Sequence, residues 1–197
     1  MQNLMIGQSL DLIWTYQVSA PTVEEYLQMV DGKTGGLFRM VSRLMATLSE
    51  SPGVRTTELN SLMTLLGRYF QIRDDYLNLA SAEYTQKKGF CEDLDEGKYS
   101  FILLHALENC DRTTRALLNN MLVERRVAGQ AGPGHKELIL SILEQSKSFQ
   151  YTVEMLAVLF DEMLVAVDAI ERSTGRGNKP IRNLLAALEI KRDVGCE

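Results

Sequence analysis

The sequence predicts an all-α fold, and three observations support that prediction. Leu, Met and Ala, which favour helices, are abundant among the 197 residues, whereas the alternation of β-branched residues that is typical of strands is scarce. The chain contains only four prolines. Apolar residues make up 45% of it, which is enough for the packed core of one large domain. We therefore expect residues 1–197 to form a single helical domain.

Nine segments repeat apolar residues with the period of an α-helix. The first carries Leu10 and Trp14, and the second begins at a capping box in which Thr22 and Glu25 would bond each other's backbone N–H groups. A glycine-rich break, residues 31–36, separates the second predicted helix from the third. The predicted helices span, in order, residues 4–16, 22–31, 36–48, 57–80, 99–109, 112–128, 136–145, 149–172 and 180–191.

Between these helices, proline and glycine predict loops at residues 51–53, 129–134 and 174–180. The connection at residues 81–98 is longer, polar and acidic, and it contains Lys88 and Lys98. Long ordered connections often carry function, although a solvated link between two helices would have the same composition. Both interpretations stay open on the charges alone.

The fourth predicted helix carries an unusual polar group within an apolar pattern. Asp74 and Asn78 are four residues apart, so a helix presents them along one edge, with Gln71 one turn earlier and Asp75 beside them. Carboxylate and amide oxygens suit a hard cation such as Mg²⁺. Acidic pairs are also common on solvated faces, but the apolar surroundings here favour a divalent-cation site over that alternative.

Two further polar clusters lie in the first part of the chain. Gln8 and Asp11 are three residues apart on an otherwise apolar helix. Lys33 and Thr34 lie in the glycine-rich break, where backbone amides and the start of the next helix could cradle a phosphate. The glycine spacing is not that of a P-loop, which argues against a nucleoside triphosphatase. A plain loop between helices would be the default interpretation of this break in isolation.

The totals exclude several classes of function. A net charge of −5 argues against nucleic acid as a partner, because phosphate-backbone binding needs a basic surface. No stretch approaches the roughly 20 apolar residues that span a bilayer. The three cysteines form no CxxC pair, which favours a reducing, cytoplasmic setting.

Four motifs, taken together, resemble the trans-isoprenyl diphosphate synthases, and among them the fungal geranylgeranyl diphosphate synthases and the prenyltransferase domains that are fused to terpene cyclases. The motifs are Gly7-Gln8-x-x-Asp11, Lys33-Thr34-Gly35, Phe70-Gln71-x-x-Asp74-Asp75-Tyr76-x-Asn78 and Glu92-Asp93-Leu94-x-Glu96-Gly97-Lys98-Tyr99-Ser100-Phe101. The resemblance implies a helical bundle of the isoprenoid synthase type. In that family, two Asp-rich helices hold Mg²⁺ on the diphosphate of an allylic substrate.

Only the second Asp-rich helix has a counterpart here. The sequence contains no DDxxD or DDxxxxD segment before Asp74, and it resembles the C-terminal two-thirds of a synthase, without the N-terminal helices. By resemblance, Asp74 binds Mg²⁺ directly, Asp75 and Asp93 hold metal-bound waters, and Asn78 offers a carbonyl oxygen. Lys33, Lys88 and Lys98 would grip the diphosphate, and Gln8, Asp11, Thr34 and Gln71 would line the same end of the cavity. Lys33, Gln71, Asp74 and Lys98 would act directly in catalysis.

The implied activity is condensation of isopentenyl diphosphate with dimethylallyl, geranyl or farnesyl diphosphate, giving geranylgeranyl diphosphate and pyrophosphate. Assembly into a homo-oligomer is implied as well. A non-catalytic homologue that binds diphosphate or a partner synthase subunit is the alternative. The missing first motif favours it, whereas the intact polar set disfavours it, since a purely structural subunit has no chemical need for Lys33, Gln71, Asp74, Asp75, Lys88 and Lys98. A class I terpene cyclase is disfavoured because the sequence has no cyclase-type NSE motif.

Overall fold

The computed structural model describes residues 2–48, 56–80 and 90–190, and all the regular structure in these ranges is helical. This confirms the all-α prediction. The helices are α1 (Gln2–Gln17), α2 (Val23–Leu48), α3 (Thr56–Ala80), α5 (Glu92–Glu96), α6 (Phe101–Asn109), α7 (Arg112–Ala128), α8 (Pro133–Gln145), α9 (Ser148–Thr174) and α10 (Lys179–Leu188).

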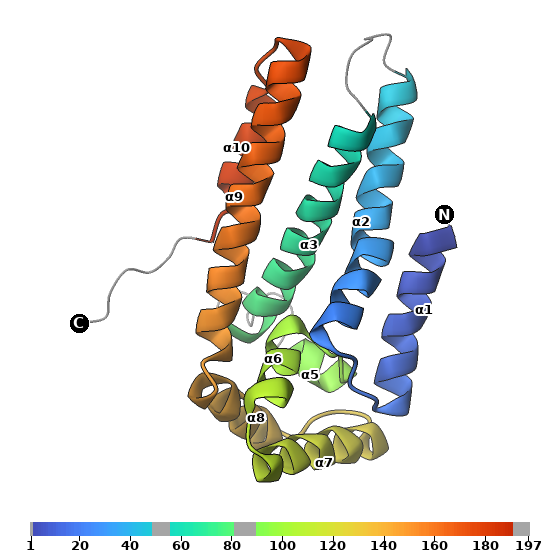
Figure 1. Ribbon diagram of the computed structural model, residues 1–197. Helices are drawn as coiled ribbons and strands as arrows, with labels where there is room; N and C mark the ends of the chain where they lie inside the picture. The colour runs from blue at the N-terminus through green and yellow to red at the C-terminus, as the bar shows by residue number, and fades with distance from the viewer. Residues whose placement is uncertain (1, 49–55, 81–89, 191–197) are drawn as a thin grey trace, which may run out of the picture.

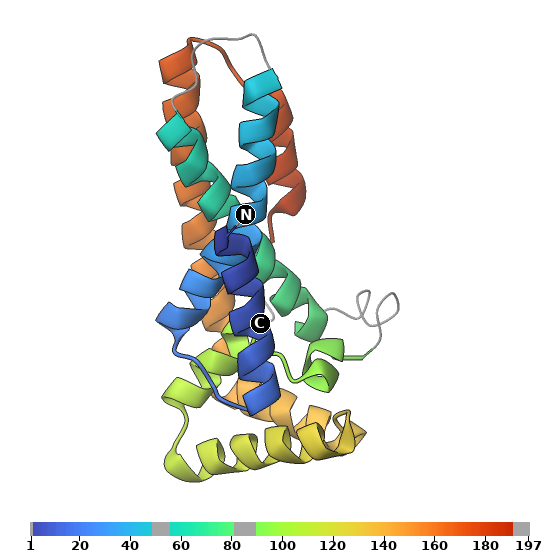
Figure 2. The ribbon, with the colours of Figure 1, turned by 90° about the vertical axis from the view of Figure 1, so that its right-hand side faces the viewer.

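Helices α1, α2, α3 and α9 form an upright bundle, and α5, α6, α7 and α8 lie at its base. In Figure 1, α2 packs between α1 and α3, and α9 covers the other side of α3. Helix α7 crosses the base of the bundle in both Figure 1 and Figure 2, with α5 and α6 above it. Among the described helices, none has the length and apolar content that crossing a bilayer requires.

Helix α6 anchors the core at the base of the bundle. Its first four residues, from Phe101 to Leu104, are almost completely buried, and it packs against α2, α3, α8 and α9. The helix begins at Ser100, whose hydroxyl accepts a hydrogen bond from the amide of Leu103. Burying each large apolar side chain contributes about 1.5–3 kcal/mol, so α6 fixes the position of the turn that precedes it. That turn carries Lys98.

Most predicted helix ends are close to the observed ones, and the predicted capping box is confirmed. The Thr22 amide donates to Glu25 Oε2 at 2.8 Å, and the Glu25 amide donates to Thr22 Oγ1 at 3.2 Å. Helix α8 begins at Pro133, three residues earlier than predicted, because proline at the first helical position has no amide that needs a partner. The predicted loop at residues 51–53 lies outside the described residues.

The predicted break at residues 31–36 is wrong, because α2 continues through it without interruption. Packing explains the difference. A Cβ on Gly7 of α1 would lie 2.6 Å from the backbone nitrogen of Lys33, and a Cβ on Gly67 of α3 would lie 2.6 Å from Gly35 Cα. The glycines of α2 therefore serve close approach of α1 and α3, and this packing outweighs their low helix propensity. The amides of this segment belong to the helix interior, so they form no phosphate cradle.

Replacing Gly67 with alanine is expected to destabilise the protein. The new Cβ would meet the Cα and backbone nitrogen of Gly35, both at 2.6 Å, and backbone cannot swing aside as a flexible side chain does. We expect the free energy of unfolding to fall by about 1–3 kcal/mol, measured by urea denaturation. Gly134→Ala is the matched control, because a Cβ there meets no described atom within 4 Å. Equal effects of the two substitutions would contradict the close packing of α2 and α3.

Candidate active site

Asp75 of α3 is the centre of a polar cluster where α2, α3 and the turn after α5 meet. Its side chain is completely buried, and both of its oxygens accept hydrogen bonds. The hydroxyl of Tyr26 donates to Oδ2 at 2.8 Å, while Gln71 Nε2 and Lys98 Nζ donate to Oδ1 at 2.9 and 2.7 Å. Because a buried carboxylate without partners is strongly destabilising, these three donors are what allow Asp75 to lie here.

Lys98 supplies the cation of this cluster. Its amine is 2.7 Å from Asp75 Oδ1 and 3.4 Å from Asp93 Oδ2. Burial lowers the pKa of Lys98, but the carboxylates of Asp75 and Asp93 outweigh burial and leave that pKa above the ordinary lysine value. The amine therefore stays protonated at neutral pH, and after its hydrogen bonds to Asp75 and Asp93 one of its three N–H groups is left for an anion.

Asp93 is a largely buried carboxylate that lies close to other carboxylates and to Lys98. Burial raises its pKa to about 6, the nearby carboxylates of Asp75 and Asp74 add to the rise, and Lys98 opposes it. The cluster contains four carboxylates and two described lysines, namely Asp11, Asp74, Asp75, Asp93, Lys33 and Lys98. A divalent cation would relieve the repulsion between these carboxylates.

A second set of contacts links this cluster to α1. Lys33 Nζ lies 2.5 Å from Asp11 Oδ2, and both side chains are largely buried. Thr34 donates its hydroxyl hydrogen to Gln71 Oε1 at 3.0 Å, so Gln71 bridges Thr34 and Asp75. Gln8 is half-buried on α1, three residues before Asp11. Thr34 of α2 is thus connected to Asp75 of α3 through Gln71, and the Lys33–Asp11 ion pair joins α2 to α1.

The sequence predicted that Asp74 and Asn78 share one edge of α3, but the side chain that is buried together with Asn78 is that of Asp75. Asp75 and Asn78 are buried, whereas Asp74 is half-buried beside them. Asn78 Oδ1 accepts a hydrogen bond from the backbone amide of Asp93 at 3.2 Å and so holds the start of α5. Direct metal binding by Asp74, Asp75, Asn78 and Asp93 stays a prediction. Lys88 lies outside the described residues.

The cluster offers carboxylate oxygens, which are the type of ligand that Mg²⁺ prefers. Within residues 2–48, 56–80 and 90–190, no three His, Cys, Asp or Glu side chains gather closely enough to cage a metal ion by themselves. Mg²⁺ commonly binds through only one or two carboxylates, while water and phosphate oxygens complete its coordination. Asp74 and Asp93 carry carboxylate oxygens of that kind, and both oxygens of Asp75 accept hydrogen bonds from protein donors.

Tyr26 is the residue that the sequence interpretation missed. It is almost completely buried, and burial together with the carboxylate of Asp75 raises its pKa well above the ordinary tyrosine value. A signal was present, because Tyr26 and Lys33 are seven residues apart and therefore share one face of a helix. The predicted break at residues 31–36 obscured that relation.

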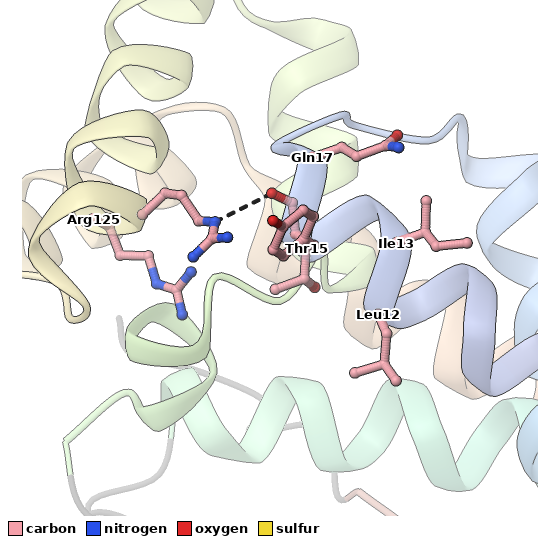
Figure 3. Close-up of a pocket in the computed structure, with 7 residues that line it drawn as sticks. Leu12, Ile13, Thr15, Gln17 and Arg125 are labelled. Atoms are coloured by element: carbon pink, nitrogen blue, oxygen red, sulfur yellow. Dashed lines mark hydrogen bonds between the residues drawn. The ribbon is translucent and has the colours of Figure 1, made fainter.

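A pocket of about 470 Å³ lies elsewhere, between α1 and α7 (Figure 3). Arg126 closes part of it, because its Nε donates to the carbonyl of Tyr16 at 3.2 Å and its guanidinium lies 4.3 Å from the centre of the Tyr16 ring. Its lining is Leu12, Ile13, Thr15, Tyr16, Gln17, Arg125 and Arg126, which includes no predicted site residue.

Comparison with known proteins agrees with the resemblance. The family model described as polyprenyl synthetase matches residues 1–132. Geranylgeranyl pyrophosphate synthase A of Phomopsis amygdali is 67% identical over 98% of this chain and 50% of its own length. Talaropentaene synthase of Talaromyces verruculosus is 46% identical over 96% of this chain and 28% of its own length. The chain thus spans half of one curated relative and about a quarter of the other.

A solved structure supports the fold. The polyprenyl synthase from Roseobacter denitrificans superposes with a TM-score of 0.73 at 22% identity, over 95% of this chain and 57% of that chain. At this identity the likeness shows the helical architecture alone. The family match covers two thirds of the chain and the relatives match nearly all of it. The chain therefore belongs to the polyprenyl synthetase family and has the helical fold of the isoprenoid synthases.

Proposed function

We propose that this chain carries the second metal and diphosphate half of a prenyltransferase site. The reaction would condense isopentenyl diphosphate with dimethylallyl, geranyl or farnesyl diphosphate, in as many successive rounds as are needed to reach geranylgeranyl diphosphate, and each round would release one pyrophosphate. One observation carries the proposal: buried Asp75, held by Tyr26 and Gln71, fixes the charged amine of Lys98 beside the carboxylate of Asp93. The 67% identity with a geranylgeranyl pyrophosphate synthase supports the choice of product.

The lysines would bind the departing pyrophosphate. When the allylic C–O bond breaks, its electron pair leaves with the diphosphate, and negative charge grows on oxygens that Lys98 and Lys33 can contact. Cations fixed in advance around such developing charge lower the barrier more than groups that must reorganise. Mg²⁺, held through Asp74 and Asp93, would add counter-charge on the same oxygens when bound. The isopentenyl double bond then bonds to the allylic carbon, and the departing pyrophosphate or a nearby base would take up the proton that the product loses.

The allylic cation would need an apolar wall that keeps water away. Phe38 of α2 and Phe70 of α3 form an edge-to-face pair, 5.9 Å between ring centres. Phe38 lies one helical turn beyond Thr34, and Phe70, whose side chain is exposed in this structure, directly precedes Gln71. Aromatic rings there would exclude water from the reacting carbon atoms.

Several wider features belong to the same proposal. Residues 1–197 would form one partial prenyltransferase domain that depends on Mg²⁺, in a cytoplasmic protein that assembles into homo-oligomers. A fused terpene cyclase domain is a further element of it, since the matched relatives include talaropentaene synthase and a bifunctional sesterterpene synthase. Exposed apolar side chains on α1 and α2, such as Tyr16 and Met45, support an assembly that covers them.

Incorporation of labelled isopentenyl diphosphate tests the function. The assay uses Mg²⁺ with dimethylallyl, geranyl or farnesyl diphosphate, on this chain and on a chimera in which it replaces the matching half of the Phomopsis amygdali synthase. We expect the chimera to release pyrophosphate and form geranylgeranyl diphosphate. A folded chimera that binds diphosphate without transferring the prenyl group would instead support the alternative, a non-catalytic diphosphate-binding or partner subunit.

A further inference from the structure

Helix α5 is too short to be stable alone, although it carries Asp93 and directly precedes Lys98. It spans five residues, Glu92–Glu96, between two positions in the left-handed backbone region, Cys91 at φ 53° and Gly97 at φ 70°. Forming a single helical turn is unfavourable for an isolated segment in water. Contacts from the rest of the protein must therefore set the position of this helix and of the two site residues.

One set of those contacts comes from α7, α8 and the connection between them. Lys136 of α8, only 8% exposed, donates to Asp95 Oδ2 and to the carbonyl of Phe90, both at 2.6 Å. The amide of Ala131 donates to Asp95 Oδ1 at 3.1 Å. Arg125 of α7 donates to the carbonyl of Asp95. Both carboxylate oxygens of Asp95 and its backbone carbonyl are thus tied to this part of the fold.

Arg125 also packs on the residue that ends α5. A Cβ on Gly97 would lie 2.6 Å from Arg125 Nη1, so the guanidinium lies directly against the turn that leads to Lys98. On the opposite side, the Asp93 amide donates to Asn78 of α3. Helix α5 is therefore held between α3 and the layer of α7 and α8.

We propose that Asp95, Lys136 and Arg125 form a clamp that positions the diphosphate site. The clamp holds α5 by Asp95 so that Asp93 and Lys98 face Asp75, and none of its three members needs to contact the substrate. They are positioning residues, and their importance rests on the proposed function of the site that they support. Loss of a group that orients metal or anion ligands typically weakens binding by about 10–100-fold.

Two measurements on the 197-residue chain test the clamp. The first is the dissociation constant of inorganic pyrophosphate in the presence of Mg²⁺, by titration calorimetry. The second is hydrogen exchange of the Gly97 and Lys98 amides without ligand, since these amides donate to the Leu94 and Asp93 carbonyls of α5. The Leu104 amide, bonded to Ser100 at the start of α6, is the internal reference.

Lys136→Met is expected to weaken pyrophosphate binding about tenfold or more and to speed exchange at Gly97 and Lys98, with exchange at Leu104 unchanged. Lys136→Arg, which keeps the cation, should restore most of the affinity. Lys179→Met is the matched control, because Lys179 is exposed at the start of α10. If Lys136→Met does not fold, Asp95→Asn carries the same test, since it keeps the shape of the side chain and removes its charge.

Unchanged affinity and unchanged exchange in the folded variants would overturn the clamp. A wild-type chain that binds no Mg²⁺-pyrophosphate would overturn the proposed function instead. In that case hydrogen exchange still tests the clamp by itself. Faster exchange at Gly97 and Lys98 in Lys136→Met than in the wild type would support the clamp, and the same rate in both would overturn it.

Discussion

Lys98→Met in the chimera is expected to lower prenyl transfer by about 10²–10³-fold, the loss that follows deletion of one preorganised electrostatic group. The substitution removes the cation that lies between Asp75 and Asp93 at 2.7 and 3.4 Å. Methionine retains the unbranched apolar stem of lysine and lacks its amine, so the loss reports the charged group. Turnover is measured as pyrophosphate release with saturating Mg²⁺.

The same change should also destabilise the protein, and this effect can be separated from the effect on turnover. Asp75 would remain completely buried with Tyr26 and Gln71 as its remaining donors, which we expect to cost about 3 kcal/mol in free energy of unfolding. Adding Asp75→Asn removes the buried charge, so the double variant should regain stability while turnover stays low. Lys179→Met controls for loss of an exposed lysine. Wild-type turnover from Lys98→Met would refute the role of Lys98.

Asp74→Ala in the chimera is expected to lower turnover about a hundredfold or more, with helicity unchanged. Asp74 is half-buried next to Asp75, and its carboxylate is near enough to contribute to the raised pKa of Asp93. An oxygen ligand lost from this position should raise the Mg²⁺ concentration needed for half-maximal turnover. Circular dichroism measures the helicity, and turnover rates over a series of Mg²⁺ concentrations measure the metal requirement.

A second readout distinguishes loss of a metal ligand from general damage. Removing the Asp74 carboxylate should lower the pKa of Asp93 towards its ordinary range, because one of the charges that raise it is gone. The pKa is measured by NMR titration of the metal-free chain. Asp161→Ala on α9 is the control, since Asp161 is exposed. An unchanged Mg²⁺ requirement in Asp74→Ala would show that Asp74 is not a metal ligand.

The helices that the sequence predicted well are those whose ends depend on local chemistry. Thr22 and Glu25 satisfy each other's amides whatever the rest of the fold does, and Gly129 ends α7 in the left-handed region that glycine tolerates. The Asp-rich helix was also predictable, because an acidic pair inside an apolar pattern is a local feature. The full resemblance needed four separate motifs read together.

The parts that were missed depend on partners distant in sequence. In sequence, the glycines of α2 resemble a helix break, because glycine has a low helix propensity. Glycine is also the residue that allows two helices to pack closely, and only the structure shows that Gly7 and Gly67 approach α2 here. Helix α5 has no pattern of its own and is fixed by Lys136, which follows Asp95 by 41 residues. The partnership of Tyr26 with Asp75 spans 49 residues. Such contacts depend on the topology of the helical bundle, and a local sequence pattern does not predict that topology.

Binding of inorganic pyrophosphate to the 197-residue chain, measured by titration calorimetry with Mg²⁺ and again with EDTA, tests the central claim most directly. The account predicts binding that requires Mg²⁺ and that weakens at least about tenfold in both Asp74→Ala and Lys98→Met, since each removes a charge from the proposed site. Absence of binding with Mg²⁺ present would contradict the assignment of this cluster as a metal and diphosphate site. An affinity equal to that of the wild-type chain in both variants would contradict it as well.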